Sequence, residues 1–152
     1  MTTSAFHTEL AALVPRLRRL AAVLVPQAEA GDALVQAVVQ HALAALASRR
    51  ADGPLDLTLF GLLAQQWLAL AGASERAPAE LANGSADLAI RQALAMLPAR
   101  QRLVVALVLV EGLRYQQAAS VLGVPLAVIG DELACARQAL GAVLPGHARS
   151  VP

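Results

Sequence analysis

Apolar and polar positions along the chain follow the period of α-helices. Five leucines recur at spacings of three and four and predict an amphipathic helix over Ser4–Leu24; they are Leu10, Leu13, Leu17, Leu20 and Leu24. Pro15 falls inside this pattern, so we expect either a kink there or a later helix start. Pro26 ends the helix.

Two further helices are predicted before the pattern changes. The second begins at Ala28 or Asp32 and runs to Ser48; the carboxylate of Asp32 suits the positive end of a helix dipole. A third helix, Leu55–Leu70, is apolar on nearly all sides. It carries Phe60 and Trp67 on one face, and we expect both in the core.

The helical pattern stops at 72–86, a small, polar segment with Pro and Gly that is typical of a linker. Asp87 is the expected N-cap of the next helix. Another helix follows over Pro98–Val110, with Pro98 as its first residue and Gly112 as its stop. We therefore predict an all-α fold of two small helical lobes joined by a flexible linker. Its units are 1–71, the linker 72–86, 87–144 and a tail, 145–152.

The end of the second lobe has the outline of a helix-turn-helix. A helix over 115–122 is followed by a turn at 123–124 and a second helix to about Leu140. In a DNA reader, the start of that second helix carries groups that reach phosphates and base edges. Here the sequence at 130–132 is Gly-Asp-Glu, so the outline and the charges disagree.

The composition points away from both nucleic acid and membrane. The net charge is only +1, and the 12 basic residues are all Arg, whereas a DNA-binding domain usually has a strong basic excess. Residues are 57% hydrophobic but 3% aromatic, which favours packed helices over strands. The longest apolar run, Leu103–Val110, is far shorter than the roughly 18 residues of a membrane span. With no secretory signal pattern and one cysteine, we expect a cytoplasmic protein.

No group of residues suggests catalysis. His7, His41 and His147 lack metal-ligand spacing, and the chain has no phosphate-binding Gly loop and no nucleophile motif. Its carboxylates are scattered. We therefore expect no enzyme, no metal site and no cofactor. Cys135 is expected as a small buried residue on the inner face of the last helix.

The second lobe resembles region 4 of the sigma-70 family, in its small extracytoplasmic-function class, whose members are two helical lobes joined by a flexible linker. The residues that carry the resemblance, in register and without gaps, are Ala93-Leu94, Leu97-Pro98, Gln101-Arg102, Val104, Leu107, Glu111-Gly112, Tyr115, Ala118-Ala119, Leu122-Gly123-Val124-Pro125, Leu133, Ala136-Arg137 and Leu140. In the first lobe, Leu17–Leu20 and Asp32–Gln36 resemble the family's region 2 over a shorter stretch.

The departures from the family pattern lie where DNA is read. Thr and Val at the opening of the recognition helix become Val128 and Ile129, and Lys-Ser-Arg becomes Gly-Asp-Glu at 130–132. A further Arg becomes Cys135, and only Arg137 remains. The family's last region 2 helix is commonly rich in aromatic and basic residues, whereas here it has no charge over 59–72. Each lost phosphate contact weakens DNA binding, and the two acids add repulsion.

This pattern is more similar to the sigma-factor-like domain of general-stress response regulators, which binds an anti-sigma factor instead of promoters. Gly31-Asp32-Ala33 and the acidic recognition helix carry that similarity. Those regulators continue into a phosphate-receiver domain, for which 152 residues leave no room. The similarity thus implies either a fragment of such a regulator or a free-standing mimic.

Two functions follow from the resemblance. The first is a sigma mimic that sequesters an anti-sigma factor, or a similar helical protein, in a stress-response partner switch, with DNA binding weak or absent. Its candidate partner-binding residues are Val104, Leu107, Val108, Tyr115, Ile129, Asp131, Glu132 and Leu133.

The alternative is a divergent sigma factor that recruits core RNA polymerase to promoters. It needs DNA contacts from Arg114, Arg137 and the N-terminal cluster of Arg16, Arg18 and Arg19. For that cluster, a solvated helix face is the simpler expectation.

Overall fold

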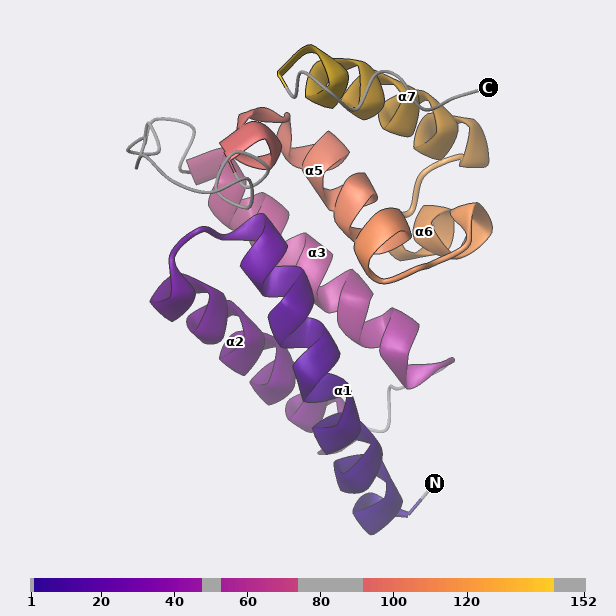
Figure 1. The fold of residues 1–152 in the computed structure, drawn as a ribbon. Coiled ribbons are helices and arrows are strands. Elements are labelled where there is room, and N and C mark those ends of the chain that lie inside the picture. Colours follow the sequence, from indigo (N-terminus) through magenta and orange to yellow (C-terminus); the bar gives the residue numbers. More distant parts are fainter. Residues whose placement is uncertain (1, 48–52, 74–91, 144–152) are drawn as a thin grey trace.

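The computed structural model describes residues 2–47, 53–73 and 92–143, and all of their regular structure is helical (Figure 1). The elements are α1 (Thr3–Leu24), α2 (Ala28–Ala47), α3 (Leu55–Ala73), α5 (Ala99–Val105), the π-helical turn η1 (Ala106–Val110), α6 (Tyr115–Leu122) and α7 (Leu126–Val143). Residues 92–96 form a further helical segment before α5. The predicted all-α fold of two helical lobes is confirmed. Asp87, most of the linker 72–86 and the tail 145–152 lie outside the described residues.

The first lobe consists of α1, α2 and α3. The side chain of Thr2 caps α1 by accepting a hydrogen bond from the backbone N–H of Ala5 at 3.3 Å, so the later helix start is wrong and the chain stays helical through Pro15. α2 begins at Ala28, which places Asp32 in its second turn; the acidic residue of the first turn is Glu29. Asp32 therefore does not mark the helix start.

In the second lobe, the helical segment at 92–96 is followed by α5, which Pro98 precedes as the N-cap instead of the first helical residue. The predicted single helix over 98–110 changes character at Ala106, because the N–H of Glu111 bonds to the carbonyl five residues back, at 3.1 Å. Gly112, at φ +70°, then reverses the chain. The predicted stop at Gly112 is thus confirmed, whereas the π turn was not predicted.

α6 and α7 form the predicted helix-turn-helix. Gly123 adopts the left-handed conformation, at φ +63°, and the N–H of Val124 closes the end of α6 on the carbonyl of Ala119 at 3.1 Å. The two helices meet at 104°, within the range of this motif. No single helix in the described part of the chain is long and apolar enough to cross a membrane; this bent pair passes the same test only when its helices are counted together.

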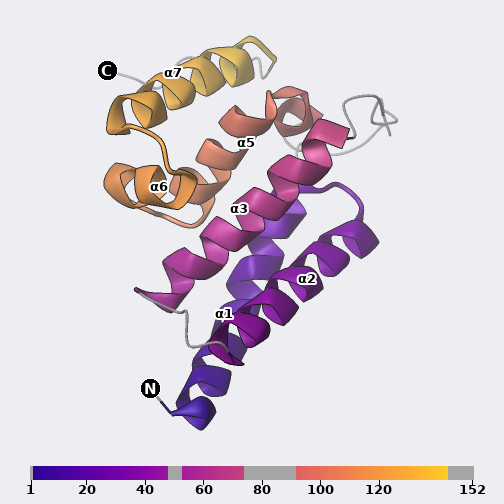
Figure 2. The same ribbon diagram turned by 180° about the vertical axis from the view of Figure 1, so that it is seen from behind.

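The two lobes are docked against each other, and α3 is the element between them (Figures 1 and 2). α3 contacts α1 and α2 on one side and α5 and α6 on the other. This explains why it is apolar nearly all round: Leu59, Phe60 and Leu63 are each at most 1% exposed. The prediction that Phe60 and Trp67 belong to the core is confirmed by their burial. A continuous hydrophobic core joins the lobes.

Candidate partner-binding surface

The orientation of α7 is set by three inward residues. Ile129, Leu133 and Ala136 are at most 1% exposed, and α7 contacts both α5 and α6. Their spacing leaves an outer face on the opposite side, which we define as Val128, Asp131, Glu132 and Cys135. Asp131 and Cys135 are exposed, and Val128 and Glu132 are half-buried. Of the positions at which the resemblance to region 4 implies DNA-reading residues, this outer face contains 128, 131, 132 and 135, and here it bears two carboxylates and no base.

Cys135 belongs to that outer face, so the expectation of a buried cysteine is wrong. The inner stripe runs through 129, 133 and 136, and residue 135 is rotated well away from it. Ala136 takes the buried place instead.

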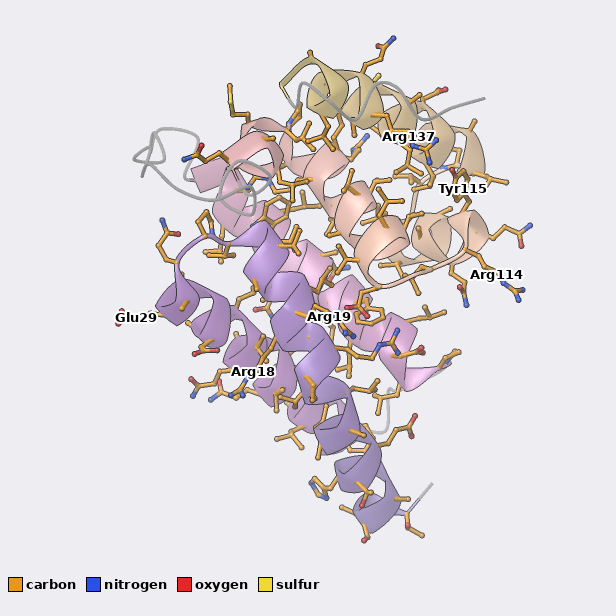
Figure 3. All side chains as sticks on the ribbon, viewed as in Figure 1. Arg18, Arg19, Glu29, Arg114, Tyr115 and Arg137 are labelled. Carbon is orange, nitrogen blue, oxygen red and sulfur yellow. The ribbon has the colours of Figure 1, made fainter. Side chains whose placement is uncertain are left out.

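Arg137, the one base retained from the family pattern, does not lie on the outer face. Successive residues of an α-helix are rotated by about 100°, so Arg137 lies about 120° around the helix from Asp131. Figure 3 shows its side chain on the side of α7 turned toward α6. Arg137 therefore cannot offset the two acids of the outer face.

Arg114 and Tyr115 lie at the start of α6. Arg114 is exposed, and its backbone N–H donates to the side-chain oxygen of Gln117 at 3.0 Å. Its side chain points away from the lobe in Figure 3 and forms no ion pair within the described part of the chain. Tyr115 is 41% exposed. Both side chains are accessible to a partner.

Half of the predicted partner-binding residues are not on the surface. Val104, Leu107, Ile129 and Leu133 are at most 1% exposed, because α5 and η1 pack against α6 and α7 through these side chains. They cannot line an open groove in this arrangement, and their place in the candidate surface is corrected to core. Val108 is half-buried, whereas Tyr115 and Asp131 are exposed and Glu132 is partly so.

Several accessible apolar side chains were not singled out from the sequence. Leu109 and Leu126 are 53% and 47% exposed, and Val110 is 37% exposed. Leu109 and Val110 end an eight-residue apolar run, in which no polar neighbour distinguishes the buried side from the open one. Only the π turn at Ala106–Val110 decides which of these side chains turn outward.

Two arginines of α1 connect the lobes. Arg16 and Arg19 donate through their Nε atoms to the two carboxylate oxygens of Glu111, at 3.0 and 3.1 Å. The expectation of a solvated arginine face is thus wrong for Arg16, whose side chain is only 32% exposed, whereas the side chain of Arg19 remains 58% exposed while it bonds to Glu111. The expectation holds for Arg18, whose side chain is 67% exposed and reaches only Asp32, at 3.9 Å.

Arg102 makes a second connection at the C-terminal end of α1. Its guanidinium donates to the carbonyls of Leu94 (2.9 Å), Ala95 and Leu97 (3.2 Å) and, across the lobes, to that of Leu24 (3.2 Å). It also lies 5.4 Å from the centre of the Trp67 ring. Burial lowers the pKa of Arg102 from its ordinary value, because the charged form is partly desolvated. Helix C-terminal carbonyls lack partners within their own helix, so Arg102 satisfies two helix ends at once.

Metal-ligating side chains are not clustered within the described ranges. No group of three or more His, Cys, Asp or Glu side chains within these ranges is placed to hold a metal ion. The polar side chains of these ranges instead form ion pairs between the lobes. Side chains of α6 and α7 are accessible to solvent.

Two family models match the chain in succession. Residues 87–140 match Sigma-70, region 4, and residues 10–64 match the Sigma2 domain of PhyR. A search of the curated proteins gives no match.

Solved structures share the complete two-lobe fold. The sigma factor RpoE of Bartonella quintana, in complex with the anti-sigma factor NepR, aligns with a TM-score of 0.77 at 24% identity, covering 95% of this chain and 99% of that one. CnrH in complex with the cytosolic domain of CnrY gives 0.74 at 23% identity, covering 93% and 88%. PhyRSL in its complex with NepR, from Sphingomonas sp. Fr1, gives 0.68 at 24% identity, covering 89% and 86%.

Sequence and structure therefore agree on the order of the two lobes, and the matching families are transcription regulators. The first lobe of this chain matches the sigma2 domain of PhyR, the second lobe matches region 4 of sigma-70, and the two-lobe fold is that of the sigma factor RpoE and of CnrH.

Proposed function

We propose that this protein is a sigma-factor mimic that sequesters an anti-sigma factor, and that it acts by protein–protein binding in the cytoplasm in place of reading promoters. The observation that carries the proposal is the outer face of α7, where Asp131 is exposed, Glu132 is half-buried and no base is present. A stress-response partner switch is the setting that fits such a mimic.

Electrostatics argue against DNA as the main ligand of this face. Phosphate neutralisation by Lys and Arg supplies most non-specific DNA affinity. A carboxylate at Asp131 would face phosphates without a counterion, since the nearest retained base, Arg137, lies on another flank of α7. The scaffold that presents a recognition helix is nevertheless intact, because the inward residues Ile129 and Leu133 are fully packed.

The similar structures support a protein partner. RpoE and PhyRSL were both solved with NepR, and CnrH with CnrY. By analogy, the partner of this chain is an anti-sigma factor or another helical protein. Its proposed contacts on the second lobe are Tyr115, Val108, Asp131 and Glu132, with Leu109 and Leu126 as accessible apolar neighbours.

Direct binding measurements test the proposal. Calorimetry with an anti-sigma protein encoded beside this gene, or with NepR as a surrogate, should give a one-to-one complex. A labelled promoter duplex at physiological salt should bind far more weakly. The proposal fails if the chain binds no anti-sigma protein and does bind promoter DNA.

A second function, promoter recognition by a divergent sigma factor, has one observation in its favour. Arg114 and Arg137 are exposed and form no ion pair within the described ranges, so both are free to reach phosphates. In vitro transcription with core RNA polymerase separates the two functions. Promoter-specific initiation would support the divergent sigma factor.

A further inference from the structure

Glu111 is a buried carboxylate at the boundary between the lobes. Its side chain is 1% exposed, although the residue as a whole retains an accessible backbone. Each carboxylate oxygen accepts one hydrogen bond, Oε2 from the Nε of Arg16 and Oε1 from the Nε of Arg19. Both arginines belong to α1 of the first lobe, whereas Glu111 follows η1 of the second, so every one of these bonds crosses between the lobes.

The first lobe holds one of these arginines in place independently of Glu111. The guanidinium of Arg16 lies 3.6 Å from a carboxylate oxygen of Asp56 and 4.9 Å from the centre of the Phe60 ring. Asp56 and Phe60 are both on α3, in the same lobe as Arg16. Arg16 is therefore preorganised to receive the carboxylate of the second lobe.

The second lobe aims the carboxylate through its backbone. The N–H of Glu111 bonds to the carbonyl of Ala106, and that of Leu113 to the carbonyl of Leu107, at 3.1 and 3.0 Å. These rings are wider than those of an α-helix, so Glu111 is rotated relative to the α5 residues before it. Gly112 then turns the chain away at φ +70°, so Glu111 is the last residue whose side-chain direction is set by the π-helical turn η1.

A buried carboxylate restricts how the lobes can pack. Apolar side chains such as those of α3 tolerate small slides against a neighbour, because dispersion and burial have little directional preference. A desolvated carboxylate without its partners is strongly unfavourable, so any docked arrangement that separates Glu111 from Arg16 and Arg19 is penalised.

We propose that Glu111, Arg16 and Arg19 form an interlobe latch that selects one docked orientation of the two lobes in the free protein. Apolar packing supplies the affinity between the lobes, and the latch supplies the orientation. This inference does not depend on the proposed function, because it concerns the chain without any partner.

The latch is tested by measuring a distance between the lobes. Spin labels are placed on native Cys135, which is exposed on α7, and at the exposed position of Glu29 on α2 (Figure 3), in the variant Glu29→Cys. Pulsed electron–electron double resonance on the otherwise unchanged full chain should give one narrow distribution of label-to-label distances. Glu111→Gln keeps the side-chain volume and removes the charge; it should widen the distribution by about twofold or add a second population.

Arg18→Gln is the matched control, because Arg18 lies on the same helix and pairs only within the first lobe. It should leave the distribution unchanged. If Glu111→Gln loses helicity by circular dichroism, the double variant Arg16→Gln/Arg19→Gln tests the same bonds from partly exposed positions. A distribution that is identical in the wild type, in the folded Glu111 variant and in the double variant overturns the latch.

Discussion

Gly61 of α3 lies directly against the backbone carbonyl of Val121 in α6: a Cβ at position 61 would be 3.6 Å from that oxygen. This contact joins the lobes, since α3 belongs to the first and α6 to the second. A distance of this size is ordinary van der Waals contact, so there is room for one methyl group and no more.

Gly61 therefore distinguishes a tolerated substitution from a disruptive one. Gly61→Ala should keep the docked fold, and it removes the entropic cost of a glycine inside a helix, about 1 kcal/mol. Gly61→Leu should force the lobes apart at this point and lower the free energy of unfolding by about 1–3 kcal/mol. Urea denaturation followed by circular dichroism measures both. Equal stability of the Ala and Leu variants would show that the contact is loose.

Restoring basic residues on α7 should restore DNA affinity if charge alone was lost. Gly130 has open space where a Cβ would be added, so Gly130→Lys fits, and Glu132→Arg removes one acid. Each new phosphate contact should steepen the dependence of log affinity on log salt by about 0.9. Fluorescence anisotropy with a promoter duplex at several salt concentrations measures the slope.

Gly141→Lys with Glu29→Arg is the control for this pair. It makes the same change in net charge, and both positions are exposed and away from the outer face. Affinity for the duplex should rise slightly in the control, through non-specific attraction alone, and markedly in the α7 variant. No gain in the α7 variant would mean that the scaffold no longer presents the helix to DNA.

Removing Arg102 should destabilise the junction of the lobes. Arg102→Ala removes the side-chain donor from carbonyls at two helix ends, of which that of Leu94 keeps the N–H of Leu97, at a cost on the order of 3 kcal/mol. Arg102→Lys keeps the positive charge but lacks the planar guanidinium that donates to several carbonyls at once, so it should recover only part of the lost stability. Trp67, the only tryptophan, is the reporter: its emission should shift to the red as water reaches it. Stability within error of the wild type for Arg102→Ala would contradict this role.

Cys135 should report occupancy of the outer face. Because the thiol is exposed, it should react with a thiol reagent in the native protein almost as fast as in urea. If the partner covers the outer face of α7, its addition should slow the reaction severalfold, whereas a duplex that does not bind should leave the rate unchanged. Full reactivity in a saturated complex would place the partner elsewhere.

The sequence determined the helices and their order by itself. The leucine spacing of α1, the break after Leu24 and the glycines at 112 and 123 are local signals, and the structure has these features where they were predicted. The reversal of charge at 130–132 was also readable, because the register of the family pattern assigns each position. Local spacing was less informative about helix starts: it left Ala28 and Asp32 open for α2, and the structure selects Ala28.

Only the tertiary structure decided which apolar and charged residues are accessible. Val104 and Leu107 resemble groove residues in sequence, yet the packing of the second lobe buries them, whereas Leu109, in the same run, is exposed. Glu111 and Arg16 are 95 positions apart, and their pairing depends on how the lobes dock. Helical periodicity specifies the face of one helix, but the partner of that face is set by packing between distant elements, which no local pattern encodes.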